Sequence, residues 1–114
     1  MMMSPIVLLN RGLQVAFISC ALAGSAYGQT MPDIGHGEMV AARDCAGCHG
    51  VSGIRAGTVV QGILVPSFPE IARRSDRTQE MLEAVVMTPH WPMPALPLQS
   101  REIRDVVGYI LSLK

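Results

Sequence analysis

The sequence is organised around the stretch Cys45-Ala46-Gly47-Cys48-His49, in which two cysteines separated by two residues are followed directly by a histidine. At this spacing each thiol can add to one vinyl group of a single haem, while the adjacent imidazole reaches the iron as an axial ligand. The pattern therefore predicts one covalently bound haem c, with Cys45 and Cys48 as the anchors and His49 as an iron ligand.

Other chemistry is compatible with the same pentad, namely a redox Cys-x-x-Cys motif, half of a zinc site, or a coincidental match. A thioredoxin-like motif follows a strand in a βαβ context, which this sequence does not show. A zinc site needs a second pair of ligands, and only His36 and His90 remain as histidines outside the pentad. The surrounding sequence therefore favours haem attachment.

Composition limits the chain to one small domain with an unusual core. Of its 114 residues, 49% are apolar, which excludes general disorder, but only 4% are aromatic. A large, flat, apolar cofactor would supply the volume that the missing aromatic side chains do not. The formal net charge is zero, so nothing indicates binding of nucleic acid or of a charged membrane surface.

Residues 1–28 have the pattern of an export signal. Arg11 precedes a mostly apolar run from Leu13 to Ala26, and small residues lie just before Gln29. This order of charged, apolar and small residues is typical of a signal peptide that is removed on export. We therefore expect cleavage near Gln29 and a periplasmic protein.

The mature protein is then predicted to be a monohaem domain of residues 29–114, without stable membrane insertion. A permanent anchor is the alternative, but polar residues leave the apolar stretch shorter than the roughly 20 residues of a spanning helix. A lipid-modified Cys20 is a further alternative, and the residues before it match a lipobox poorly.

Four helical segments are predicted in the mature chain. The expected ranges are 35–44, one turn over 67–72 with Pro69 at its first helical position, 79–87 capped by Thr78, and a last helix capped by Ser100. The last helix has an apolar stripe, with Asp105 expected on its solvent side. Between these helices we expect a wrapped loop over 50–66 that lines the haem edge and a stiff, proline-rich loop over 88–99. A strand over 58–60 is the alternative within the first loop, but it lacks an evident partner.

Several residues outside the pentad have open interpretations. His36 is expected to be exposed rather than to act as a ligand. Arg73, Arg74 and Arg77 form either a solvated face or a contact with a haem propionate or an acidic partner. Gly108 lies inside the last helix, where glycine costs about 1 kcal/mol relative to alanine, so we expect another helix backbone to approach it closely.

With these features in place, residues 35–114 resemble the small bacterial class I cytochromes c. Gly37 lies eight residues before Cys45, and Gly108-Tyr109 matches the small and aromatic pair of the family's last helix. The resemblance implies an all-α fold of three to four helices around one covalently bound haem, with the N- and C-terminal helices crossing at these small residues. Ala41 departs from the family, which often has an aromatic residue at this position.

The resemblance also assigns further site residues. Pro66 matches the proline whose carbonyl holds Nδ1–H of the proximal histidine, His49, and Met93 matches the distal methionine that completes the iron coordination. The other methionines and His90 are rivals for the second position; the methionines concerned are Met31, Met39, Met81 and Met87.

The expected function is one-electron transfer rather than catalysis, because a haem with both axial positions filled passes an electron with little rearrangement. The protein would act in the periplasm as a free carrier or as the haem subunit of an oxidoreductase. Its partner would be a redox protein such as a periplasmic dehydrogenase or a terminal oxidase. The alternatives are a haem-based ligand-binding or sensor protein with an open sixth position, and a zinc-binding interaction module.

Overall fold

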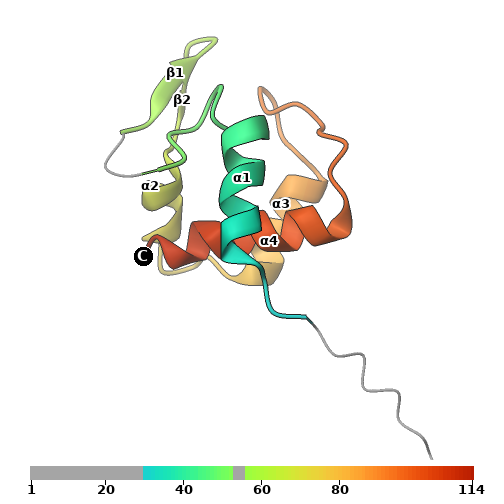
Figure 1. Ribbon diagram of the computed structural model, residues 1–114. Coiled ribbons are helices and arrows are strands. Elements are labelled where there is room, and N and C mark those ends of the chain that lie inside the picture. The colour runs from blue at the N-terminus through green and yellow to red at the C-terminus, as the bar shows by residue number, and fades with distance from the viewer. Residues whose placement is uncertain (1–29, 53–55) are drawn as a thin grey trace, which may run out of the picture.

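The structure, a computed structural model, describes residues 30–52 and 56–114. The expected export signal, including Cys20, lies outside the described residues. In chain order the elements are α1 (Ile34–Asp44), β1 (Thr58–Val60), β2 (Ile63–Val65), α2 (Phe68–Ala72), α3 (Gln79–Met87) and α4 (Ser100–Ser112) (Figure 1). The predicted all-α class is confirmed, since the only sheet in this part of the chain is one small hairpin.

The crossing of α1 and α4 is the most extensive contact between elements. Figure 1 shows α1 lying across α4. Val40 and Ala41 of α1 are fully buried against Val106 and Val107 of α4. An added Cβ at Gly37 would overlap the backbone carbonyl of Asp105, so only glycine permits this approach. The predicted crossing is therefore confirmed. Ala41, where the family often has an aromatic residue, is fully buried within it.

Gly108 has a different neighbour from the one expected. A Cβ at Gly108 would overlap the side chain of Pro32, which lies in the segment that leads into α1, rather than the backbone of a helix. Gly37, and not Gly108, is where the backbone of the other helix lies close enough to exclude a side chain. Gly108 instead lets the chain before α1 pack against α4.

Asp105 differs from the sequence-based expectation, which placed its side chain toward solvent, whereas the His36 side chain stays 31% exposed and does not line the cavity. Asp105 is only 2% exposed. Its carboxylate accepts hydrogen bonds from the backbone N–H of Asp33 at 2.9 Å and from Nδ1 of His36 at 2.7 Å. Burial raises the pKa of the Asp105 carboxyl, but these two donors outweigh it and lower that pKa overall. The carboxylate therefore joins the start of α1 to α4.

The segment expected as a wrapped loop contains a hairpin. Thr58 pairs with Val65 and Val60 with Ile63, so the partner of the first strand directly follows it in the chain. The two connecting residues, Gln61 and Gly62, have φ values of 50° and 78°. Positive φ at both positions is the signature of a type I′ turn, whose twist matches that of a hairpin. The expectation of an irregular loop was wrong because the strands are too short to show a periodic pattern.

Local capping sets the starts of the shorter helices. Thr78 caps α3 as predicted, and its hydroxyl accepts the backbone N–H of Met81 at 3.2 Å. Two other helices begin slightly earlier than expected: Ser67 caps α2, which puts Pro69 at its second position, and Gln99 rather than Ser100 caps α4.

Within the part of the chain that the structure describes, every helix is too short or too polar to cross a membrane.

The crossing generates a first prediction, which compares two Gly→Ala changes in the same helix. A Cβ at Gly37 overlaps backbone, whereas one at Gly35 would lie 3.6 Å from Oδ1 of Asp33, an ordinary contact. We expect Gly37→Ala to lower the free energy of unfolding by about 1–3 kcal/mol, despite the better helix propensity of alanine. Gly35→Ala should leave it unchanged or raise it. Guanidinium denaturation of the holoprotein measures both, and equal effects would contradict the role of Gly37.

Candidate cofactor site

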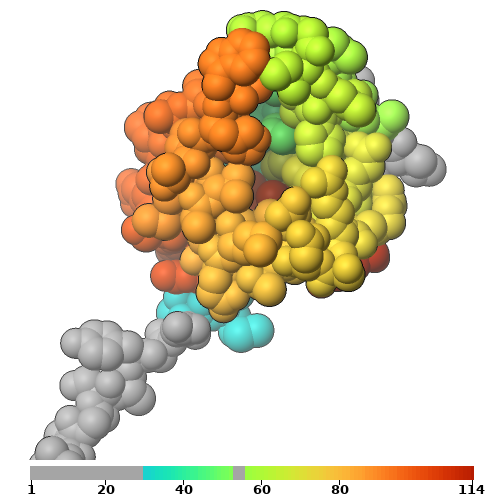
Figure 2. All heavy atoms as spheres, turned by 180° about the vertical axis from the view of Figure 1, so that it is seen from behind, coloured from blue at the N-terminus to red at the C-terminus, as the bar shows by residue number. Residues whose placement is uncertain are grey.

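A cavity of about 450 Å³ opens on one side of the molecule. Figure 2 looks into this hollow, which is framed by the hairpin segment in lime, α2 and the following turn in yellow, and the end of α3 with the loop over 88–99 in orange. Val106 and Ile110 of α4 also line it. The volume lies within the usual range of ligand pockets, about 300–1,000 Å³. Its lining is mainly apolar, as a large flat cofactor requires.

The pentad lies on the wall of this cavity because it continues directly from α1. The N–H of Cys45 donates to the carbonyl of Ala41 at 2.9 Å and so closes the helix. A tight turn follows, in which the N–H of His49 donates to the carbonyl of Cys45 at 2.9 Å. As a result Cys45, Cys48 and His49 all line the cavity.

The cysteines are free thiols, and the environment of Cys45 does not activate it. Burial, with a smaller contribution from the nearby Asp44 carboxylate, raises the pKa of the Cys45 thiol to about 11. Reactive redox cysteines instead have a pKa below the ordinary value, because the thiolate is the nucleophile. This finding weighs against a thioredoxin-like role for the pentad.

The His49 ring is held in one orientation. Its Nδ1 donates to the carbonyl oxygen of Pro66 at 2.7 Å, since a carbonyl can only accept. This bond leaves Nε2 as the nitrogen with a free lone pair, the state in which imidazole binds a metal. The Phe68 ring packs beside the imidazole with its centroid 5.3 Å away, and the N–H of Phe68 donates to the carbonyl of Gly50 at 2.8 Å. The hydrogen bond and the packing together fix the ring.

The peptide that accepts the hydrogen bond of His49 is itself bound by Glu70, a residue that the sequence did not mark as part of the site. The N–H of Ser67 donates to a carboxylate oxygen of Glu70 at 2.7 Å, and the N–H of Glu70 donates back to the Ser67 hydroxyl at 3.3 Å. This reciprocal pair is a capping box at the start of α2. The sequence signal for it is a serine followed three residues later by a glutamate, which is present at these positions.

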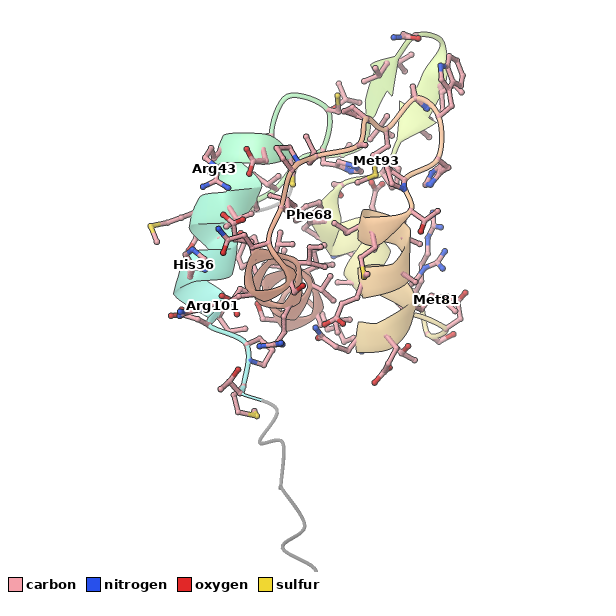
Figure 3. All side chains as sticks on the ribbon, turned by 90° about the vertical axis from the view of Figure 1, so that its right-hand side faces the viewer. His36, Arg43, Phe68, Met81, Met93 and Arg101 are labelled. Atoms are coloured by element: carbon pink, nitrogen blue, oxygen red, sulfur yellow. The ribbon has the colours of Figure 1, made fainter. Side chains whose placement is uncertain are left out.

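Met93 is the methionine, among those described, that lines the cavity. It is carried there by the loop over 88–99, where its N–H donates to the carbonyl of His90 at 2.8 Å. Figure 3 shows Met93 on this loop and Phe68, the first residue of α2, deeper in the molecule. The remaining described methionines lie elsewhere and are largely exposed; they are Met31, Met39, Met81 and Met87. His90 also lines the cavity and so remains a rival donor.

Two of the three clustered arginines reach the cavity. Arg74 and Arg77 line it, whereas Arg73 does not. The only acidic residue in the lining, Asp44, already accepts hydrogen bonds from Arg43 at 2.6 and 2.9 Å. Arg77 also lies 3.7 Å from the carboxylate of Asp76, so Arg74 is the lining cation that no carboxylate in the described ranges pairs with.

The donor set fits one haem c. An apolar cavity, two thiols in the same turn, an imidazole with Nε2 free and a thioether match the attachment and axial groups of that cofactor. Arg74 and Arg77 are cations that suit its carboxylates. In the described ranges, no three side chains from histidine, cysteine, aspartate and glutamate converge as a separate metal site.

Comparisons with known proteins agree with this geometry. The family model described as Cytochrome c matches residues 34–114. The chain is 40% identical over 94 residues to cytochrome c-552 of Bradyrhizobium diazoefficiens, an alignment that covers 82% of this chain and 88% of that protein. No solved structure matches the chain significantly.

Proposed function

The chain belongs to the cytochrome c family, and on this premise we propose that it is a periplasmic one-electron carrier whose haem iron is bound by His49 and Met93. Electron transfer by covalently bound haem c follows from the family itself, and it makes the protein a redox partner of another protein rather than a catalyst. What we propose beyond the family assignment is the identity of the axial ligands and of the haem anchors, the compartment, and the partner.

The proposal rests on the set of residues that line the cavity. Cys45 and Cys48 would anchor the haem, His49 would bind the iron through Nε2, and Met93 would complete the coordination. The Pro66 carbonyl would keep the imidazole oriented. A thioether opposite an imidazole raises the reduction potential, and filled axial positions leave no vacancy for a substrate. The arrangement therefore suits electron transfer and not ligand activation.

We also propose that residues 1–28 are removed on export and that residues 29–114 are the working protein. The support is the order of charged, apolar and small residues before Gln29. In the periplasm the protein would serve as a free carrier or as the haem subunit of an oxidoreductase. Its donor or acceptor would then be a dehydrogenase or a terminal oxidase.

The partner would dock at the mouth of the cavity. Leu64 and Trp91 line the cavity and are 70% and 68% exposed, so two large apolar side chains are accessible beside the cofactor site. The basic side chains of Arg74 and Arg77 lie on the same lining. Transient redox contacts are small, below about 1,200 Å², and depend on charge steering. An apolar centre with basic residues beside it suits a partner with an acidic rim.

The ligand assignment is tested by Met93→Ala. Loss of the thioether should lower the reduction potential, because a thioether ligand raises that potential. It should also open the iron to carbon monoxide, because the thioether would otherwise occupy the sixth position. Met39→Ala is the matched control, since Met39 is exposed on α1 and does not line the cavity. An unchanged low-spin spectrum in Met93→Ala would move the assignment to His90. Wild-type protein that binds carbon monoxide at once would favour the sensor alternative.

Export and attachment are tested together by the intact mass of protein purified from the periplasm and then denatured. The mass should equal that of residues 29–114 plus one haem, because thioether bonds survive denaturation. A retained Met1 would favour an anchor over a cleaved signal. Haem that separates on acid extraction would contradict attachment through Cys45 and Cys48.

The docking surface is tested by charge reversal at Arg74. Arg74→Glu should slow reduction by the physiological donor on the order of tenfold at low ionic strength, with little effect at high ionic strength. Lys114→Glu is the control, because Lys114 is exposed and lies outside the cavity lining. Stopped-flow kinetics measures both rates. If the reduction rate changes neither with the substitution nor with ionic strength, Arg74 belongs to a solvated face and not to the docking surface.

A further inference from the structure

One peptide group connects a carboxylate to the side chain proposed as the proximal iron ligand. The peptide bond between Pro66 and Ser67 contributes both the carbonyl that accepts Nδ1–H of His49, at 2.7 Å, and the N–H that donates to Glu70, also at 2.7 Å. Carboxylate, peptide and imidazole thus form a continuous chain of two short hydrogen bonds.

We propose that Glu70 is a positioning residue that tunes His49 through this peptide, a role that rests on the proposed axial ligation. A negative charge on the N–H side of a peptide polarises it and increases the electron density on its carbonyl oxygen. The Pro66 oxygen then becomes a stronger acceptor, and the His49 ring acquires more imidazolate character. A more basic proximal ligand favours ferric iron, so Glu70 lowers the reduction potential.

The tuning role requires a negative charge on the Glu70 carboxylate, and this charge is present near neutral pH. The pKa of Glu70 lies below its ordinary value, mainly because the Ser67 backbone N–H donates to the carboxylate, with smaller help from the nearby Arg73. The carboxylate is therefore ionised in the folded protein.

The surroundings hold the chain of hydrogen bonds in place. Ser67 is fully buried, between β2 and α2. An added Cβ at Gly57 would lie 2.5 Å from the carbonyl oxygen of Val65 and 3.3 Å from Oε2 of Glu70, so the preceding loop packs directly against this corner. On the other side, the N–H of Phe68 donates to the carbonyl of Gly50. These contacts leave the Pro66–Ser67 peptide little freedom to turn away from His49.

The same protein contains a second capping box that makes a matched control. Glu102 accepts the backbone N–H of Gln99 at 2.9 Å at the start of α4, the same relation that Glu70 has to Ser67. Glu102 does not line the cavity. A substitution there removes a cap charge, which also pairs with Arg43 at 2.8 Å, without touching the peptide that holds His49.

The experiment compares Glu70→Gln and Glu102→Gln in the haem-loaded protein. Glutamine keeps an oxygen that can accept the N–H of Ser67 but removes the charge. Two readouts are required in addition to thermal stability: the reduction potential, and the chemical shift and exchange rate of the His49 Nδ1 proton by NMR of the reduced protein. The NMR signal separates an effect through the peptide from a general change in charge.

The proposal predicts that Glu70→Gln raises the potential, moves the His49 Nδ1 proton upfield and speeds its exchange, whereas Glu102→Gln changes none of these. If Glu70→Gln alters only thermal stability, Glu70 is a helix cap and the proposal is overturned while the proposed function stands. If the wild-type protein shows no low-spin iron bound by His49, the proposed function fails and the tuning role fails with it.

Discussion

The contact between Gly37 and the backbone of Asp105 is the constraint on which the arrangement depends. Because a side chain at Gly37 would overlap that backbone, α1 and α4 approach more closely there than other residues would allow. The C-terminal end of α1 leads directly into the pentad, and α4 supplies Val106 and Ile110 to the cavity wall. The distance between the haem anchors and the opposite wall is therefore set by two helices that cross with no space between them.

A second corner of the molecule decides how the imidazole is presented. The Pro66 carbonyl lies between the end of β2 and the cap of α2, and both elements are very short. Neither would be stable alone, so the corner relies on the Ser67–Glu70 capping box and on the bond from Phe68 to Gly50. The proposed tuning of His49 and the folding of this corner would consequently depend on the same few hydrogen bonds.

Features with a strong local signal could be predicted from the sequence, whereas those with a weak local signal or a distant cause could not. The helices and the Thr78 cap follow from apolar spacing and from single capping residues, and the pentad has a specific spacing. The hairpin was missed because its strands span three residues each and Gln61 is not a typical residue at positive φ. Asp105 was assigned to solvent because helix periodicity cannot reveal that Asp33 and His36, about 70 residues away in the chain, satisfy its carboxylate. The sequence already favoured Met93 over the other methionines, from its place in the stiff loop, and Met93 lines the same cavity as the pentad.

We propose that this cavity presents one nitrogen from His49 and one sulfur from Met93 to a single iron. X-ray absorption fine structure at the iron edge of the native, reduced holoprotein tests this coordination, because the method counts the nitrogen and sulfur atoms bound to the metal. We expect six-coordinate iron with five nitrogen neighbours, four of the macrocycle and one of histidine, and one sulfur neighbour. Six nitrogen neighbours, or five-coordinate iron without sulfur, would contradict it.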